Sequence, residues 1–481
     1  MLTIDWIPIK KDTVPLYRQI IFYIKAKILS GQWPVGTKLP PQRELAALFA
    51  VNRSTLCIAL DELTAAGFVE SKRGSSSYIS NNTWANFSQH SVDWNPYLNT
   101  ASDLSNIPLI QKINQLEFSP DIIRLGTGEL SPSLLPNKRL KSIIAQASQK
   151  ITSFGYQEPL GLFELREQIS LQLKKSGIQA SPASILIVSG ALQALQLIFF
   201  GLLAPYSRIL LERPSYLRSL KMFYSRQLQF SEVSLDANGP SLSAIRHQQE
   251  KKPHALFYTI PTFHNPTGTL VSATRRHSLV SLCQKLRLPI LEDNVYHDLW
   301  LDEPPPPSLK SLDTQGNVLH IDSLSKSVGP GLRIGWIVGP EPIIEKLGDL
   351  KMQHDYGSSI VSQWIACEWL QQGLHEKHML QLRQKLKQRR TIMLRCLEKY
   401  FHDFAQWQVP AGGFYIWLRL NKPISQQYLF AKALEKKILL NPGSIYDNLS
   451  NTNLRLSYAF ASPDEIEKSL YELSLILKNF T

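Results

Sequence analysis

The sequence predicts an α/β protein with a small N-terminal helical module, a polar connecting segment and a large domain built on a mostly parallel sheet. Three observations support this fold class. Residues 13–80 carry helical periodicity and end in two short strand patterns, residues 81–120 are polar with no sustained apolar period, and residues 121–481 alternate short apolar runs with amphipathic stretches. Strands that alternate with helices indicate a mostly parallel sheet.

The composition excludes several classes of protein. Hydrophobic residues make up 43% and charged residues 19% of the 481 residues, which is a globular composition and excludes wholesale disorder. At roughly 100–200 residues per domain, we expect two to four domains. The longest apolar runs, such as LQLIFFGLLA near residue 200, fall short of the roughly 18 residues needed to span a bilayer. We therefore expect no membrane association.

The N-terminus and the cysteines indicate a cytoplasmic protein. The start MLTIDWIPIKKD has no basic stretch followed by an apolar core, so we expect no signal peptide. The four cysteines are scattered without a CxxC pair, which excludes a disulfide scaffold and a cysteine-based zinc site and fits a reducing compartment. We expect no bound metal.

The net charge of +13 is compatible with a polyanionic partner, but its distribution matters more than its size. Residues 1–80 hold ten Lys and Arg against six Asp and Glu, so most of the excess lies in the large domain. Any DNA affinity must therefore depend on a few well-placed residues.

The first predicted helix covers residues 15–30. Leu16, Ile20, Ile24 and Ile28 are spaced four apart and so share one helical face. A proline opens this stretch and a glycine follows it, as is typical of helix boundaries.

Two more helices and a hairpin complete the module. QRELAALFA (42–50) predicts a short second helix, and Asn52 is a suitable N-cap for a third helix over 53–67. FVESKRGSSSYI predicts two short strands around residues 72–74. Three helices followed by a β-hairpin make a winged helix-turn-helix.

This motif suggests DNA-binding residues. In a winged helix-turn-helix, the first turn of the third helix (53–55) meets base edges and phosphates in the major groove. Arg43 would reach the same groove or the backbone, and the hairpin tip would lie on the minor-groove side. The alternative is an ordinary three-helix subdomain with solvated charges. The candidates are Arg43, Arg53, Ser54, Thr55, Lys72, Arg73 and Gly74.

The large domain contains a lysine in an unusual loop. Lys326 follows the predicted strand VLHIDSL inside the segment SLSKSVGPGLR, with Ser323 before it and Arg333 seven residues after it. A lysine that forms a Schiff base must lie near an aldehyde and stay partly neutral, and hydroxyls with an arginine suit a phosphate. A lone loop lysine is usually just solvated, so this interpretation depends on the other motifs.

Three further motifs suit an aromatic cofactor. Asp293 ends a predicted strand in LEDNVYHDL, with Tyr296 three residues later, and an aspartate against a pyridinium nitrogen keeps that ring protonated. Asn265 in FHNPTG could donate to a phenolate oxygen, and Tyr216 in ERPSYLR could stack on a flat ring. Taken singly, NPTG could be only a turn and Tyr216 only a core residue.

The remaining candidates would bind anions. The turn Gly190-Ala191-Leu192 in VSGALQAL offers free N–H groups to a phosphate, and Arg455 on a late strand suits a carboxylate held by two hydrogen bonds. We hypothesise that Arg218 is a second carboxylate contact near the substrate pocket; the alternative is a surface arginine.

Residues 14–79 resemble the GntR-type winged helix along nearly its full length. The block GTKLPPQRELA and the NRST start of the third helix carry the resemblance. Cys57 departs from the pattern, because the family often has a DNA-contacting arginine there.

Residues 120–480 closely resemble fold-type I pyridoxal-phosphate enzymes of the class-I aminotransferase group. The resemblance implies a mostly parallel seven-stranded sheet with a small C-terminal lobe. The GALQ turn departs from the usual pattern, because Ala191 and Leu192 replace residues that often donate side-chain hydrogen bonds. The implied roles are an aldimine at Lys326, a ring-nitrogen contact at Asp293, 3′-oxygen contacts at Asn265 and Tyr296, ring stacking at Tyr216, phosphate contacts at Ser323 and Arg333, a substrate carboxylate contact at Arg455, and contact with the partner subunit's phosphate at Tyr156 in FGYQEPLG.

The fusion of these two parts resembles the MocR subfamily of bacterial transcription regulators. The resemblance implies a cytoplasmic, nucleoid-associated homodimer that binds operator DNA and senses an amino compound, or pyridoxal phosphate itself, through an aldimine at Lys326. A response to pyridoxal phosphate alone would suit control of vitamin B6 synthesis. The rival hypothesis is a genuine aminotransferase with an accessory DNA-binding segment. We expect regulation, not turnover, as the main role, and the sequence leaves transamination open.

Overall fold

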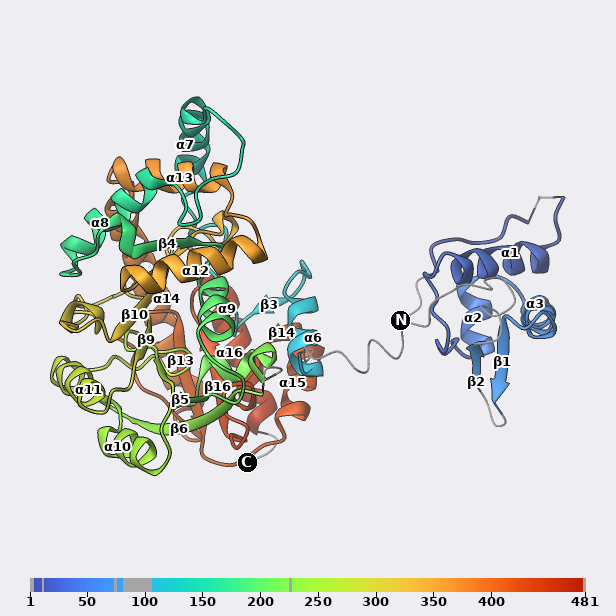
Figure 1. Ribbon diagram of the computed structural model, residues 1–481. Coiled ribbons are helices and arrows are strands. Elements are labelled where there is room, and N and C mark those ends of the chain that lie inside the picture. Colours follow the sequence, from blue (N-terminus) through green and yellow to red (C-terminus); the bar gives the residue numbers. More distant parts are fainter. Residues whose placement is uncertain (1–3, 11–12, 73–75, 81–105, 225–226, 479–481) are drawn as a thin grey trace. The chain divides into compact units, whose positions relative to one another are not determined.

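The chain folds into two units, shown in a computed structural model in Figure 1. The structure describes residues 4–10, 13–72, 76–80, 106–224 and 227–478. The two compact units are Met1–Ala101 and Ser102–Thr481. Each has a hydrophobic core of its own, so each is described separately.

The N-terminal unit is the predicted winged helix-turn-helix. Ile20, Ile24 and Ile28 are buried in its core, as their spacing predicted. The Asn52 side chain caps the third helix by accepting a hydrogen bond from the Thr55 amide. The elements are α1 (Leu16–Leu29), α2 (Gln42–Leu48), α3 (Arg53–Ala65), β1 (Val69–Lys72) and β2 (Ser76–Ile79), and the two strands pair antiparallel.

The C-terminal unit contains an eight-stranded, mostly parallel sheet. Its eighth strand, β7, has only two residues and adds to the seven strands that the family resemblance implied. Only β11 runs antiparallel to its neighbours within the body of the sheet, where it pairs with β4 and β10. The order is β4 (Ile185–Val188), β11 (Gly335–Val338), β10 (Val318–Ser323), β9 (Ile290–Asp293), β8 (Leu256–Thr259), β5 (Arg208–Arg213), β6 (Gln229–Asp236) and β7 (Gly239–Pro240).

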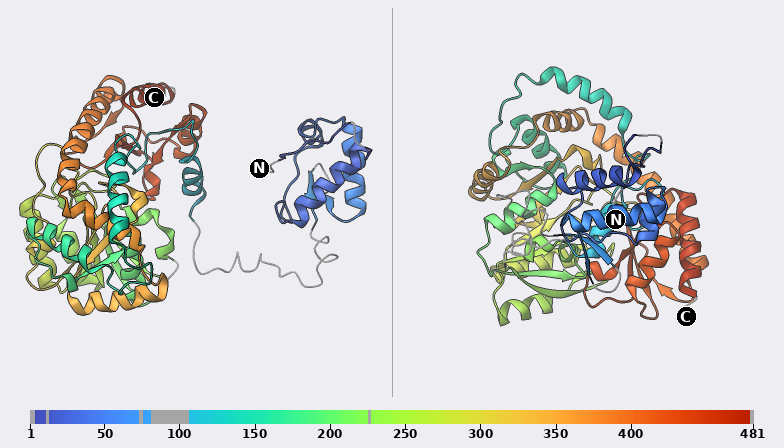
Figure 2. Two further views of the ribbon diagram at one scale, coloured as in Figure 1. Left: turned by 90° about the horizontal axis from the view of Figure 1, so that it is seen from above. Right: turned by 90° about the vertical axis from the view of Figure 1, so that its right-hand side faces the viewer.

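Helices cover both faces of this sheet, as the views in Figures 1 and 2 show. Alternate residues of β4 face different cores: Leu186 lies in the core that includes α9, whereas Ile187 lies in the core that includes α8 and α13. Since both faces are covered there, β4 is a continuous apolar run, ILIV. The helices around this sheet are α7 (Asn137–Lys150), α8 (Phe163–Lys175), α9 (Ala191–Gly201), α10 (Leu242–Lys251), α11 (Ala273–Lys285), α12 (Glu341–His354) and α13 (Ile360–Gln371).

A smaller lobe follows the long helix α14 (Leu374–Phe401). It holds a four-stranded sheet whose central pair, β13 and β16, is antiparallel. Figure 1 shows α14 and α16 side by side, and the two helices are in contact. The lobe's elements are β12 (Ala405–Gln406), β13 (Tyr415–Leu420), β16 (Asn453–Ser457), β15 (Asn441–Pro442), α15 (Gln426–Glu435) and α16 (Pro463–Lys478).

The end of the predicted linker belongs to the C-terminal unit. Helix α6 (Pro108–Leu116) lies within the segment 81–120, and its Ile113 is buried in the large core. Nearby, β3 (Ile123–Arg124) pairs in parallel with β14 (Ile438–Leu439). Residues 81–105 lie outside the described part of the chain. Among the described helices, none is both long and apolar enough to cross a membrane.

Candidate functional site

The carboxyl ends of the central strands meet the N-terminus of α9 at a cavity of about 360 Å³, which we call the strand-end cavity. It lies where open α/β sheets usually bind ligands. The structure brings ten of the predicted residues to it. They are Ala191, Leu192, Tyr216, Asn265, Asp293, Tyr296, Ser323, Lys326, Arg333 and Arg455.

Asp293 presents a buried carboxylate at the end of β9. The Tyr258 hydroxyl donates to its Oδ2 at 2.8 Å, whereas its Oδ1 is buried with no partner among the described residues. Burial raises the pKa of this carboxyl, against the lowering effect of the Tyr258 hydrogen bond. A buried carboxylate oxygen without a donor is costly, so it fits a ligand that brings an N–H group.

Lys326 lies in the loop after β10. Its Nζ donates to the Gly128 carbonyl at 2.7 Å. The Ser323 Oγ lies 2.8 Å from the Ile334 carbonyl oxygen and 2.9 Å from the Ser325 Oγ. The amine and the two hydroxyls thus line one wall of the cavity, held by backbone groups.

The turn before α9 and the loop after Lys326 form an anion site. Gly190 has a φ of +85°, and a Cβ there would lie 2.7 Å from the Arg333 Nη2. Glycine therefore lets the guanidinium approach, and Arg333 donates to the Ser189 carbonyl at 2.7 Å. The first amides of a helix have no acceptor within it and attract anions. Backbone amides, an arginine and hydroxyls suit a phosphate.

Arg455, on β16, is buried and points its charge into the same cavity. Its Nη1 donates to the Asn265 Oδ1 at 2.9 Å, and its Nη2 donates to the Gly126 carbonyl at 2.7 Å. Its Nε is buried without a partner among the described residues. The Tyr415 ring lies 4.3 Å from the guanidinium carbon. No carboxylate in the described part of the chain pairs with Arg455, which leaves its charge for a ligand carboxylate.

Tyrosines line the rest of the cavity. The Tyr296 hydroxyl lies 3.0 Å from the Tyr415 hydroxyl. Burial raises the pKa of Tyr296 well above its usual value, and it also raises the pKa of Tyr216. Both phenols therefore stay protonated and able to donate.

Three predicted residues do not line the strand-end cavity. Gly190 is the residue just before α9, next to the lining residue Ala191, and the other two are Arg218 and Tyr156. Arg218 does not line it, because its Nε donates to Glu232 at 2.7 Å and its Nη1 donates to the Tyr224 hydroxyl at 2.7 Å. The Glu232 carboxylate on β6 pairs with this guanidinium, and the hypothesis of a second carboxylate contact at Arg218 stays a prediction. Tyr156 is 82% exposed, with its ring 4.6 Å from that of Tyr356. Its contact with a partner subunit stays a prediction.

Sequence reasoning missed several residues of the site. Ser325 directly precedes Lys326 in the motif SLSKSVGPGLR. The sequence Gly126-Thr127-Gly128 follows a short apolar run, and such a glycine-rich turn after a strand could have indicated a ligand site. Tyr258 and Tyr415 sit in apolar strand runs, which the sequence pattern assigns to the core. The missed residues that line the cavity are Glu117, Thr127, Gly128, Glu129, Ser325 and Tyr415, together with the apolar Leu195, Ile260 and Val295.

The winged helix exposes part of the predicted DNA-binding surface. Arg43 on α2 and Arg53 on α3 are exposed. The Asn52 Oδ1 accepts from the Ser54 hydroxyl at 3.0 Å and from the Thr55 hydroxyl at 2.5 Å, so these side chains also organise the cap of α3. Lys72 ends β1. The other predicted wing residues, Arg73 and Gly74, lie outside the described residues.

Comparisons with known families agree with this division. Residues 16–79 match the family "Bacterial regulatory proteins, gntR family", and residues 120–473 match "Aminotransferase class I and II". Cys57, the departure noted in the sequence, lies on α3, where its Sγ is 3.5 Å from the Gln42 Oε1 of α2.

Curated relatives share the whole arrangement. The chain is 47% identical over 467 residues to the uncharacterized HTH-type transcriptional regulator YisV of Bacillus subtilis, covering 97% of this chain and 96% of the relative. It is 36% identical over 445 residues to the HTH-type transcriptional regulator NorG of Staphylococcus aureus, covering 92% and 99%.

Solved structures match the C-terminal unit. An archaeal alanine:glyoxylate aminotransferase aligns with a TM-score of 0.75 at 29% identity, covering 81% of this chain and 100% of the other. The kynurenine aminotransferase of Pyrococcus horikoshii, solved in complex with PMP, aligns with a TM-score of 0.74 at 28% identity, covering 78% and 95%. With a GntR-type reader and an aminotransferase domain in one chain, and relatives of the same length that are transcriptional regulators, the protein belongs to the MocR subfamily of GntR-type transcriptional regulators.

Proposed function

We propose that this regulator binds pyridoxal phosphate in the strand-end cavity and responds there to a small amino compound that carries a carboxylate. The observation that carries the proposal is the unpartnered Oδ1 of Asp293, buried in the cavity that also holds the Lys326 amine. A pyridinium N–H would satisfy that oxygen. Burial raises the pKa of the Asp293 carboxyl, and a pyridinium cation beside it would lower that pKa again and so favour the ionised carboxylate.

Each part of the cofactor has residues that suit it. Ser323, Arg333 and the first amides of α9 would hold the phosphate, and Tyr216 would stack on the ring. Tyr296 and Asn265 would donate to the ring oxygen. When bound, pyridoxal phosphate supplies an aldehyde that reacts reversibly with amines. Lys326 would supply the amine of the resting protein.

Arg455 would select and orient the effector. Its guanidinium would form a two-point contact with a carboxylate, while Asn265 and the Gly126 carbonyl hold it in place. The Tyr415 ring beside the guanidinium excludes water and strengthens that contact. The effector is then an amino acid or a similar compound with both groups.

Effector binding would change DNA binding through the equilibrium between two states of the protein. A ligand shifts that equilibrium only by its differential affinity for the two states. A homodimer would present two readers to an operator in the bacterial cytoplasm, and half-site spacing would then match the separation of the readers.

The test combines absorption spectroscopy with DNA binding. Full-length protein mixed with pyridoxal phosphate should gain the absorption band of a lysine-bound cofactor, and Lys326→Ala should lose it. Lys432→Ala, which removes an exposed lysine paired with Glu435, is the matched control and should keep the band. The protein should also bind a fragment of its own promoter region, with an affinity that an amino acid changes only when Lys326 is present. An unchanged spectrum in Lys326→Ala would overturn the proposal.

A second candidate function is amino-group transfer between amino acids and keto acids. It is favoured by the presence of Lys326, Asp293 and Arg455 in a single cavity. Multiple-turnover keto-acid production without specific DNA binding would favour this enzyme reading over the regulator.

A further inference from the structure

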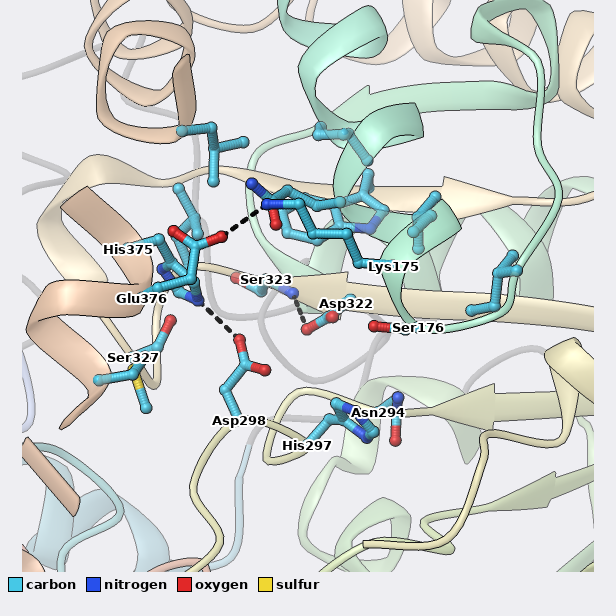
Figure 3. A pocket seen from close by; sticks show the side chains of 18 of the residues that line it. Lys175, Ser176, Asn294, His297, Asp298, Asp322, Ser323, Ser327, His375 and Glu376 are labelled. Carbon is cyan, nitrogen blue, oxygen red and sulfur yellow. Dashed lines mark hydrogen bonds and ion pairs between the residues drawn. The ribbon is translucent and has the colours of Figure 1, made fainter. Parts of the chain in front are cut away.

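A second cavity, of about 350 Å³, lies behind the first, on the other side of the β9 and β10 strand ends; we call it the rear cavity (Figure 3). Asn294, Asp298 and Asp322 from the strand side of the sheet face Glu376 and His375 of α14 across it. Asn294 directly follows Asp293, which lines the strand-end cavity, and Ser323 lines both. Its volume lies in the range of small-molecule sites.

The rear cavity contains buried polar atoms that have no partner in the described part of the chain. Three of these atoms belong to side chains that are at least nine-tenths buried: the acceptor Asn294 Oδ1, the His320 Nε2 and the donor Trp336 Nε1. The fourth is the Nδ1 of the half-buried His297. The His320 Nδ1, by contrast, lies 2.9 Å from the Glu292 carboxylate. Buried polar groups almost always have partners, so four unsatisfied ones around a single cavity point to a ligand.

Asp322 is the charged centre of the rear cavity. Its Oδ1 accepts the Ser323 amide at 2.7 Å, and no ion pair of the described residues reaches it. Burial raises the pKa of this carboxyl well above its usual value, with a further rise from Asp298, Asp293 and Glu292. The site thus holds an acid that is not ion-paired with any cation of the described residues.

The cations near Asp322 are engaged elsewhere. Arg383 donates its Nε to the Asp298 carbonyl at 2.7 Å, and Lys175 of α8 pairs with Glu376 at 2.8 Å. His375 pairs with Asp298 at 2.7 Å, and burial lowers the pKa of His297. The titratable and charged groups that line the cavity or act on Asp322 are Asp293, Glu292, His297, Asp298 and His320 from the strand side, Lys175 from α8, and His375, Glu376 and Arg383 from α14.

We propose that the rear cavity binds a small protonated amine with an apolar body, whose N–H groups bond Asp322 and the Asn294 Oδ1. The carboxylates of Asp298, Asp322 and Glu376 line this space, which disfavours an anion. Apolar walls complete it, because Leu173, Leu324 and Met379 also line it. Lys175 and Glu376 are about half exposed, so their ion pair lies at the solvent boundary of the cavity, across its top in Figure 3.

Amine binding there would act on the first cavity through Ser323. Asp322 accepts the Ser323 amide, and Ser323 lines both cavities. An ionised Asp322 accepts that amide more strongly, which fixes the loop that carries Lys326. This coupling step rests on the proposed function, whereas amine binding itself does not.

The experiment measures phenethylamine binding to full-length, cofactor-free protein by titration calorimetry, with phenethyl alcohol as the neutral control. We expect one site for the amine and none for the alcohol. Asp322→Asn should weaken binding at least tenfold, whereas Glu341→Gln, a carboxylate lost away from the cavity, should change it less than twofold. Asp293→Asn makes the same change in the strand-end cavity. A larger loss in Asp293→Asn than in Asp322→Asn would place the amine in the wrong cavity and overturn the proposal.

Proton release provides a test that needs no variant. Below its raised pKa the Asp322 carboxyl is protonated, and it gives this proton to the buffer as the ammonium binds. Binding should then release up to one proton per amine and tighten as pH rises through that pKa. Titrations in buffers of different ionisation enthalpy measure that number. Zero release at every pH, or equal binding of the alcohol, would overturn the proposal. Failure of the proposed function would instead appear as a missing absorption band with amine binding intact.

Discussion

At the scale of single residues, Asp293 and Asp322 are carboxyls that suit a ligand but lower the stability of the folded protein. Both carboxyls lie at the ends of neighbouring strands, and burial raises the pKa of each. An acid with a raised pKa in the folded state binds more protons there than in the unfolded chain, so the folded state loses stability as pH rises between the two pKa values. Such destabilised groups are common where a ligand will bind.

Asp293→Asn should therefore stabilise the cofactor-free protein near neutral pH. Asparagine can still accept the Tyr258 hydrogen bond but carries no buried charge. The gain in unfolding free energy should shrink as pH falls through the raised pKa of Asp293 towards 3.8, because the wild-type carboxyl is then neutral as well. Urea unfolding at a series of pH values measures this. A gain that is the same at every pH would contradict the role of ionisation.

The same residues show what the sequence could predict about the site. Asp293, Lys326 and Arg333 stand in motifs whose residue types and spacing match one cofactor, so their positions could be predicted. The position of Arg218 could not be predicted. It lies two residues after Tyr216 in a 3₁₀ turn, where its side chain pairs with Glu232 of another element, β6. Tyr258 lies in an apolar strand and was not predicted. The pairing of β8 with β9 brings its hydroxyl to Asp293, and no local pattern shows that pairing.

At the scale of elements, the N-cap of α3 links stability to DNA recognition. The Asn52 side chain holds the Thr55 amide and the Ser54 and Thr55 hydroxyls. Asn52→Ala should destabilise the N-terminal unit by about 1 kcal/mol and weaken DNA binding, because the first turn of α3 loses its order. Urea unfolding and fluorescence anisotropy measure the two effects. Ser272→Ala removes the cap of α11 in the other unit and should leave DNA affinity unchanged.

The turn that begins α9 allows a sharper test of phosphate binding. Gly190→Ala places a Cβ 2.7 Å from the Arg333 Nη2 at a φ of +85°, so it strains the turn and displaces the guanidinium. Affinity for pyridoxal phosphate should fall at least tenfold, while affinity for pyridoxal, which lacks the phosphate, changes little. Gly331→Ala in the neighbouring loop is the control, because a Cβ there meets open space. Equal losses for both ligands would contradict a phosphate role.

Element boundaries followed from the sequence where local chemistry sets them. Asn52 and the glycine after α1 mark their helix ends through capping and a left-handed turn. Helix α6 falls within the predicted linker because its nine residues are too short a stretch to show a sustained apolar period, and its place is set by Ile113 packing in the large core. The two-residue strand β7 likewise depends on pairing with β6, which no local pattern encodes.

At the scale of the whole molecule, the chain joins two units with separate cores. Among the described residues, the core of the N-terminal unit is built from residues between Ile4 and Ile79, and the cores of the C-terminal unit are built from residues from Leu109 onward. Most of the +13 net charge lies outside residues 1–80. Salt-sensitive attraction to DNA can therefore come from the large unit, whereas sequence reading depends on α3.

Separate cores predict two calorimetric transitions. Asn52→Ala should lower only one of them, which identifies the N-terminal unit. Pyridoxal phosphate at about 100 times its dissociation constant should stabilise the other by about 2.7 kcal/mol, because only the C-terminal unit contains the strand-end cavity. Lys326→Ala should reduce that shift, since it removes the amine that holds the cofactor. A single transition that moves as one with either change would show that the two units unfold cooperatively, and it would contradict the independence that their cores imply.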